Sequence, residues 1–354
     1  MKRKCNLSLI IILILILVPA LSGCGGGKKG GGPGGNPGGN PGGGPGGTTY
    51  TPGQQSPAYT VGGVTFHMRY APSATSLPTG TDDSGTGSVS NPFWIAETEV
   101  TYELWSVVYK WATGDTNLSG DIDGTETPGT YTIARVGVMG DGTGDTDRHP
   151  VTTVSWRDTI VWCNALTEYY YGNSDNCVYY ENAAYTAPIR TSTNADVDTA
   201  LGTQDNPYVK ADAKGFRLPT SDEWELAARY HFKEGIQWLP GDHVSGDDTG
   251  YCYNSGISTT ESLIFGKYAW YRDNSSSTHA VATTELKNAL NLSDMSGNVW
   301  EWCFDWDLGL ISLGRVLRGG CWLDNADRLR LGRVDYGNMV YAFSDLGFRP
   351  VRTQ

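Results

Sequence analysis

The sequence predicts an α+β fold that is rich in loops, with short strands and few helices. Three stretches carry this prediction, because in each an apolar run leads to a capping residue and then to apolar residues at helical spacing; they lie at 91–111, 149–166 and 214–229. The segments between them are long, polar and without periodicity. The chain has 12 Trp and 20 Tyr, and we expect these rings to fill the gaps that regular packing leaves.

The first two stretches each predict a strand that enters a helix. Residues 91–101 end at Thr101, which can cap a helix with the apolar residues Leu104, Val107, Val108 and Trp111. Residues 149–156 contain Ser155, which can cap a helix with the apolar residues Ile160, Val161, Cys163 and Leu166. We therefore expect a helix after each of these two strands.

The third stretch, Lys214 to Arg229, contains a capping box. Thr220 stands at the N-cap position and Glu223 follows three residues later, so each side chain can bond the other residue's backbone N–H. No linker of Gly and Pro interrupts the chain after this point or before it, back to Tyr59. We therefore expect residues 59–354 to form one domain.

The first 58 residues predict export followed by a flexible tether. Met1-Lys-Arg-Lys is basic, Leu7 to Ala20 is almost wholly apolar, and Leu21-Ser-Gly precedes Cys24; this order is typical of a signal peptide, and a spanning helix needs about 20 apolar residues. Leu-Ser-Gly-Cys resembles the lipobox of bacterial lipoproteins, which implies removal of 1–23 and acylation of Cys24, with palmitate for example. The alternative is an ordinary secretory signal. Residues 24–58, rich in Gly and Pro, form the tether.

Charge and cysteine content exclude some partners and leave the disulfides open. The formal net charge is −12, whereas a nucleic-acid-binding protein is expected to carry a basic face. Two of the seven cysteines, Cys5 and Cys24, belong to the signal and the lipid anchor. The others are Cys163, Cys177, Cys252, Cys303 and Cys321. Their number is odd, so at least one stays unpaired, and the pairing of the rest is left open.

Six motifs, in order along the chain, resemble those of the formylglycine-generating enzyme family, whose domains are also called sulfatase-modifying factors. They are Glu97-Thr-Glu-Val-Thr101, His149-Pro-Val with Val154-Ser-Trp156, Phe216-Arg-Leu-Pro-Thr-Ser-Asp-Glu-Trp-Glu-Leu-Ala-Ala-Arg229, Leu292-Ser-Asp-Met-Ser-Gly-Asn-Val-Trp-Glu-Trp302, Arg318-Gly-Gly-Cys-Trp322 and Gly347-Phe-Arg349. The resemblance covers the chain from about Val61 to its last residues. It implies a variant of the C-type lectin fold.

The resemblance does not extend to the chemistry of the enzymes. Active members of the family use two cysteines just after the Gly-Gly-Ser-Trp/Tyr element to bind copper, and soft thiolates suit Cu(I). By spacing, those positions fall here on Asp324 and Leu329, and Cys321 takes the place of the serine, three residues too early. The five scattered histidines do not form the triad of an iron-dependent relative. We therefore expect no copper and no enzyme activity of this type.

The last segment of the chain resembles the variable region of proteins that diversity-generating retroelements rewrite. Those proteins carry a fixed Arg-Val-Leu-Arg-Gly-Gly-x-Trp, a variable run and a fixed Leu-Gly-Phe-Arg, which match residues 315–322 and 346–349 here. The retroelement mutates adenines, mostly in AAC codons, which then cannot yield Lys, Glu, Gln, Trp or Met. Residues 323–345 lack the first four, and Met339 alone breaks the rule. Cys321 also fits, because one adenine change turns a serine AGC codon into TGC.

We therefore predict a variable segment at about 321–345 that binds ligand. Loops on a rigid scaffold can change without unfolding it, and Tyr, Phe and Arg side chains contribute most at interfaces. The candidate ligand-binding residues are Leu323, Asp324, Asn325, Asp327, Arg328, Arg333, Asp335, Tyr336, Gly337, Asn338, Val340, Tyr341, Phe343, Ser344 and Asp345. By contrast, Leu329, Arg330 and Gly332 belong to a spacer that we interpret as fixed frame.

Two places could bind calcium. One is an acidic loop with the spacing of an EF-hand, Asp115, Asn117, Ser119, Asp121, Asp123 and Glu126, for which a solvated loop is the alternative. The other is implied by the family resemblance, with Asp294 and Glu301 as side-chain ligands and Gly297 and Val299 as carbonyl ligands. A structural turn with capped carboxylates is the alternative there.

The sequence thus predicts a lipoprotein of the bacterial cell envelope, displayed outward on its tether, that binds a protein or glycan ligand which differs between variants. Two other functions stay open. One is an oxidase-type enzyme of the formylglycine-generating kind with relocated chemistry, and the other is an invariant accessory domain of the envelope. Neither the ligand, the membrane face nor the oligomeric state follows from the sequence.

Overall fold

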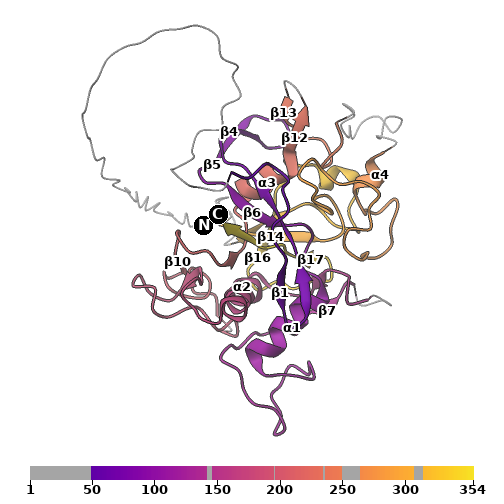
Figure 1. Cartoon of the computed structure of the whole chain (residues 1–354). Coiled ribbons are helices and arrows are strands. Elements are labelled where there is room, and N and C mark those ends of the chain that lie inside the picture. Colours follow the sequence, from indigo (N-terminus) through magenta and orange to yellow (C-terminus); the bar gives the residue numbers. More distant parts are fainter. Residues whose placement is uncertain (1–48, 142–145, 195, 234–235, 249–263, 307–313) are drawn as a thin grey trace, which may run out of the picture. The chain divides into compact units, whose positions relative to one another are not determined.

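Two four-stranded sheets organise the described part of the molecule (Figure 1). The computed structural model describes residues 49–141, 146–194, 196–233, 236–248, 264–306 and 314–354. The first sheet has the order β11-β18-β6-β3, and its strands are Phe216–Arg217, Val351–Thr353, Phe93–Ala96 and Met68–Ala71. All of its pairs are antiparallel. β6 is buried along its whole length, as expected of a central strand with both faces covered.

The second sheet defines where the predicted variable segment begins and ends. Its order is β16-β15-β14-β17, with strands Asp335–Asn338, Gly314–Arg318, Trp300–Trp306 and Leu346–Gly347. β15 pairs with one side of β14 in antiparallel fashion, and β17 pairs with its other side in parallel. The segment therefore leaves one neighbour of β14 and returns to the other, and β14 fixes both ends.

Two-stranded ribbons complete the strand content of the described residues. They pair β1 with β2, β4 with β5, β7 with β8, β9 with β10, and β12 with β13. Their bounds are Tyr59–Val61, Val64–Phe66, Ala74–Thr79, Gly85–Val89, Val138–Met139, Val151–Thr152, Tyr179–Tyr180, Tyr208–Val209, Tyr230–Lys233 and Ile236–Trp238. Most have two or three residues, so loops carry much of the chain. The predicted α+β class with short strands and few helices is confirmed.

Three helices begin at the residues that the sequence predicted. α1 (Tyr102–Thr113), α2 (Trp156–Tyr171) and α3 (Ser221–Arg229) have Thr101, Ser155 and Thr220 as N-caps, and each cap side chain accepts a backbone N–H. α2 and α3 both have complete capping boxes. The helices end where a left-handed glycine, or the first residue of β12, takes over. A single turn, α4 (Phe265–Tyr268), and a 3₁₀ turn, η1 (Ala326–Leu329), follow.

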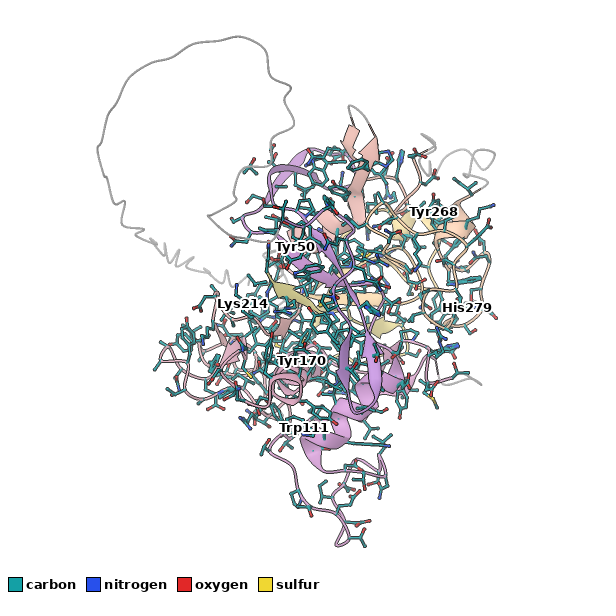
Figure 2. All side chains as sticks on the ribbon, in the orientation of Figure 1. Tyr50, Trp111, Tyr170, Lys214, Tyr268 and His279 are labelled. Carbon is teal, nitrogen blue, oxygen red and sulfur yellow. The ribbon has the colours of Figure 1, made fainter. Side chains whose placement is uncertain are left out.

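The helices cover different parts of the core. α1 and α2 pack on each other at one end of the domain, whereas α3 lies toward the other end, beside the β4–β5 ribbon (Figure 1). Trp105 of α1 and Trp162 of α2 stack on each other, and Phe348 meets both rings edge-on in the same hydrophobic core cluster. α2 is buried on nearly every face, so it is a core helix. Trp111 of α1, by contrast, is 39% exposed (Figure 2), and its ring stacks on Tyr169.

The domain includes residues that the sequence assigned to the tether. Tyr50 packs against Tyr70 and Trp94, and Gln55 pairs with Arg69 in an isolated bridge. The second of the chain's two compact units accordingly begins at Tyr50, before the predicted boundary at Tyr59. The predicted signal peptide, Cys24 and the glycine-rich part of the tether lie outside the described residues. Within the described part, no helix is long and apolar enough to span a membrane.

Candidate functional site

A buried ion pair fixes the frame on which the last segment is mounted. Glu301 of β14 accepts two bonds from Nε of Arg349, one from its Nη2 at 2.6 Å and one from Nε1 of Trp224 at 2.8 Å. Both ionic side chains are at most 1% exposed. Three N–H groups donate to the two oxygens of Glu301, and the Nε–H of Arg349 is shared between both oxygens, so this carboxylate is fully used inside the protein.

A second buried arginine joins α3 to the spacer within the segment. Arg318 of β15 binds Glu225 at 2.5 Å and Ser221, and its Nη1 donates to the carbonyls of Leu331 and Arg333. The spacer itself is packed, since Leu331 is buried and a Cβ on Gly332 would stand 2.1 Å from the backbone of Gly80. The interpretation of this spacer as frame agrees with its burial, although Arg330 is partly exposed.

In the rest of the segment, some residues lie on the surface and others are buried in the core. Four of the candidate residues are the exposed apolar side chains Leu323, Tyr336, Tyr341 and Phe343, which are 46%, 47%, 47% and 54% exposed. Asn325 is exposed as well. Partly exposed candidates are Asp324, Asp327, Arg328, Arg333, Asp335, Asn338, Val340, Ser344 and Asp345. These residues supply charged and polar groups around the apolar ones.

Gly337 does not belong to this surface. It is buried, and a Cβ there would lie 2.6 Å from the ring of Trp302. Gly337 is therefore part of the frame, where a larger residue has no space. Met339, which breaks the adenine rule, is completely buried in the same core cluster. A fixed core position explains why it need not obey a rule for variable codons.

Contacts within the segment leave its aromatic rings available. Arg328 pairs with Asp335 at 2.6 Å, and Arg330 with Asp327 at 2.9 Å. The rings of Tyr341 and Phe343 lie 5.2 Å apart at 46°. The segment thus offers paired charges of opposite sign and an exposed apolar pair, a combination that suits a mixed polar and apolar partner surface.

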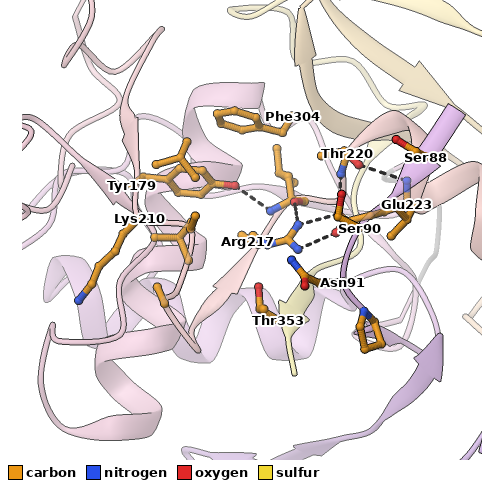
Figure 3. A pocket seen from close by; sticks show the side chains of 17 residues that line it. Ser88, Ser90, Asn91, Tyr179, Lys210, Arg217, Thr220, Glu223, Phe304 and Thr353 are labelled. Atoms are coloured by element: carbon orange, nitrogen blue, oxygen red, sulfur yellow. Dashed lines mark hydrogen bonds and ion pairs between the residues drawn. The ribbon is translucent and has the colours of Figure 1, made fainter. Parts of the chain in front are cut away.

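Two cavities lie elsewhere in the domain. One, of about 290 Å³, lies beside the start of α3, and there Arg217 and Glu223 form two bonds of 2.7 Å with each other (Figure 3). The other, of about 410 Å³, is lined by Glu97, Glu99 and Arg148 among others. No residue of 321–345 lines either of them. The candidate surface is therefore a face of the molecule, separate from both cavities.

Comparison with known proteins assigns the family. The family model described as sulfatase-modifying factor enzyme 1-like domain matches residues 60–354. The chain belongs to this family. The predicted resemblance to formylglycine-generating enzymes, and with it the C-type lectin-like fold, is confirmed.

Relatives of this sulfatase-modifying-factor chain include a variable protein, a chaperone and an inactive formylglycine-generating enzyme. The solved Treponema denticola variable protein 1 is 28% identical with a TM-score of 0.59, and the match covers 85% of this chain and 99% of that one. A chaperone protein, LppX, of Paenibacillus barcinonensis is 28% identical over 61% of this chain and 75% of its own length. The inactive Cα-formylglycine-generating enzyme 2 of Bos taurus is 31% identical over 38% of this chain and 44% of its own length.

The positions of the family's copper-binding thiols hold residues of other chemistry. Asp324 accepts from the Cys321 amide at 3.1 Å, and Leu329 is fully buried. The Cys321 sulfur lies 3.3 Å from Asp324 and 3.8 Å from Asp345, and burial, then these two carboxylates, raises the pKa of the thiol. A thiol in such surroundings is a poor nucleophile. Cys163, Cys177 and Cys303 are free and buried, while Cys252 lies outside the described residues.

The calcium ligands that the resemblance implied fit in part. Glu301 does not fit as a side-chain ligand, because Arg349 and Trp224 already occupy its carboxylate. Asp294 fits better, since its Oδ2 accepts from Ala282 while its buried Oδ1 has no partner. Nearby Glu99, which the sequence did not single out, is 1% exposed with neither carboxylate oxygen bonded. Burial, then the charge of Asp294, raises the pKa of Glu99 well above its usual value.

The acidic loop at 115–126 uses its carboxylates on its own backbone. Asp115 accepts from the amides of Ser119 and Gly120, and Glu126 accepts from those of Thr116 and Asn117. Within the described part of the chain, no three His, Cys, Asp or Glu side chains are arranged around a common point to hold a metal. Calcium binding by this loop stays a prediction.

Proposed function

We propose that this chain is the variable protein of a diversity-generating retroelement, which binds its ligand through the exposed side chains of 323–345. The observation that carries the proposal is the division of this segment into exposed and buried residues. Large apolar side chains stand on the surface at Leu323, Tyr336, Tyr341 and Phe343, between neighbours that are buried in a rigid frame. Two of them, Tyr341 and Phe343, are in contact with each other, and exposed apolar side chains that adjoin often mark a binding surface.

The buried position of Met339 supports the proposal from a different direction. The adenine rule concerns variable codons, and the one residue of 323–345 that violates it has no exposed surface. The structural likeness to the Treponema variable protein, which covers nearly all of that chain, adds to this support.

The gene offers the sharpest test. We expect a near-copy of the last codons close by, with AAC where the exposed residues stand, together with a reverse transcriptase gene. The codons of Gly337 and Met339 should be unchanged between copy and gene. An invariant C-terminus in many isolates, without a template copy, would instead favour the accessory envelope domain. Oxygen-dependent conversion of a cysteine peptide to formylglycine would favour the enzyme.

The ligand is proposed to be a protein or glycan that differs between variants, and the chain is proposed to be displayed by a lipid on Cys24. Membrane anchoring can be tested by metabolic labelling with an alkyne analogue of palmitate. The label should enter the wild-type chain, and Cys24→Ala should remove it and release the protein from the membrane fraction. Labelling that survives Cys24→Ala would disprove this anchor.

A calcium ion at Asp294 is a further part of the proposal, with Glu99 as its second carboxylate. Hard oxygen ligands suit calcium, and the two carboxylates together offer three buried oxygens without a hydrogen-bond partner. Without a cation, these charges oppose burial, because Arg349 is already paired with Glu301. Glu99→Gln should therefore raise the melting temperature in chelator.

The same variant tests the cation directly. Calcium at millimolar concentration should raise the melting temperature of the wild type and produce heat in a titration calorimeter, whereas Glu99→Gln should respond much less. Glu126→Gln is the matched control in the acidic loop, and its response reports on that loop alone. An identical calcium response of wild type and Glu99→Gln would remove Glu99 from the site.

A further inference from the structure

The body of the domain contacts the candidate segment through main-chain atoms. At its aromatic end, Nη2 of Arg135 donates to the carbonyl of Val340 at 3.0 Å, and the amide of Thr153 donates to the carbonyl of Phe343 at 3.0 Å. These two carbonyls flank Tyr341, so both bonds hold the backbone that presents the aromatic pair.

The other end of the segment is held in the same way. Nε of Arg272 donates to the carbonyl of Leu323 at 3.0 Å, and the Arg272 amide donates to the carbonyl of Asp324, also at 3.0 Å. Arg318 does the same for the spacer in the middle. Arginines from three distant parts of the chain therefore converge on backbone oxygens.

Side chains of the segment take no part in this attachment by polar contacts. Among the described residues, every hydrogen bond and ion pair made by a side chain of 323–345 has its partner within 321–345, as for Arg328 with Asp335 and Asp324 with Cys321. Replacing such a side chain therefore removes no bond to the body. An attachment to main-chain oxygens is the same whichever residues the segment carries.

The attachment is itself well supported. Nη1 of Arg135 is bound by Asp158 at 3.0 Å, and Asp158 belongs to the capping box of α2. Thr153 adopts a positive φ of 57°, which is unfavourable for a β-branched residue. In this conformation its amide reaches Phe343. Outliers of this kind persist where the surrounding structure fixes them.

We infer that Arg135 and Arg272 are positioning residues of the binding surface, and that they hold its backbone independently of the variable side chains. The inference rests on the proposed function in so far as this surface binds ligand. It adds that these two arginines, which lie 205 and 51 positions before the carbonyls of Val340 and Leu323 that they bind, need not contact the ligand; they fix the position of the residues that do.

Hydrogen–deuterium exchange of the full chain tests the inference without any ligand. The amides of Tyr341 and Leu346 report on the aromatic end, because they bond the carbonyls of Asn338 and Phe343. Losing one hydrogen bond should make them exchange roughly fivefold faster in Arg135→Gln. Arg135→Lys should restore part of the protection, since it retains one charged donor. Arg148→Gln is the matched control, because Arg148 is exposed and makes no polar side-chain contact with the segment.

Variants of the segment's own side chains test the converse expectation. Tyr341→Ser and Phe343→Ser should leave exchange of the Leu346 amide unchanged, since the bonds to the backbone remain. Unchanged exchange in Arg135→Gln, or faster exchange in the serine variants, would overturn the inference. If Arg135→Gln lowers global stability, Arg272→Gln provides the same test at the other end, read at the amide of Asp324, which bonds the Cys321 carbonyl.

A failure of this inference can be distinguished from a failure of the proposed function. A phage-displayed peptide library and a glycan array serve as binding probes for the wild type and for Arg135→Gln. If exchange changes as expected and no probe binds the wild type, the positioning role stands and ligand binding does not. If a probe binds both proteins equally and exchange is also unchanged, the positioning role is wrong while ligand binding stands.

Discussion

The protein holds parts of its chain in place in two different ways, which are illustrated by the Glu301–Arg349 pair and by the segment 323–345. Glu301 and Arg349 meet through side chains, with three short contacts and at most 1% exposure, so neither residue can be replaced without loss of stability. The segment is held at its carbonyls, and its polar side chains bond one another or face outward. A residue whose side chain makes the attachment cannot be replaced without breaking it. A residue that is held only through its backbone can be replaced.

This difference explains how a binding surface can be variable on a fold that is not. Burial of Trp302, Met339 and Leu329 stabilises the region from below, and none of this depends on what Tyr336 or Tyr341 happens to be. Stability and recognition therefore reside in different residues of the same segment, often in neighbours along the chain.

The largest effect is expected from breaking the buried pair. Arg349→Ala leaves the Glu301 carboxylate buried with Trp224 as its remaining donor, and should lower the free energy of unfolding by about 3–5 kcal/mol. Urea unfolding followed by Trp fluorescence measures the loss. Arg330→Ala is the control from the segment, where the partly exposed pair with Asp327 should contribute about 0–1 kcal/mol.

The outcome decides whether the two regions differ as described. If Arg349→Ala does not accumulate as folded protein, Glu301→Gln tests the same pair with a smaller change in volume. Comparable losses for the frame variant and for Arg330→Ala would contradict the division into fixed and free regions.

Local elements of the fold could be predicted from sequence, because their causes lie within a few residues. Thr101, Ser155 and Thr220 cap their helices through bonds to residues three positions on, and such spacing is visible in the sequence. The parallel pairing of β14 with β17, which places the segment, was not predicted. It joins Trp300 to Leu346, and no local pattern signals a pairing between strands separated by a long irregular segment.

The site shows the same division. Tyr336, Tyr341 and Phe343 could be identified as exposed candidates from their types and setting, and the structure places all three on the surface. Gly337 could not be separated from them, because what excludes a side chain there is the ring of Trp302 from another strand. Arg135 and Arg272 gave no signal, since their partners are backbone carbonyls. Glu99 lies in a motif that carried the resemblance, and a search for unpaired acids there could have found it.

A medium effect on stability is expected from replacing a buried residue of the segment, in comparison with an exposed residue close to it in sequence. Met339 is completely buried and Tyr341 is half exposed, although they are two positions apart. Met339→Ala should lower the free energy of unfolding by about 2–5 kcal/mol through lost burial and a cavity. Chemical denaturation of both alanine variants measures the difference. A larger loss for Tyr341→Ala than for Met339→Ala would show that the segment is sorted differently.

The smallest effect on stability should accompany the largest effect on binding. Tyr336→Ala combined with Tyr341→Ala removes two half-exposed rings that make no hydrogen bond to the body, so the free energy of unfolding should change by about 0.5 kcal/mol or less per site. Binding to any peptide or glycan probe selected on the wild type should be lost, because aromatic anchors contribute most at interfaces. Calorimetric melting and surface plasmon resonance measure the two quantities on the same preparations. Arg148→Ala, on the exposed surface away from the segment, should change neither. A large fall in melting temperature would mean that the rings stabilise the fold, and retained binding would mean that the ligand is recognised elsewhere.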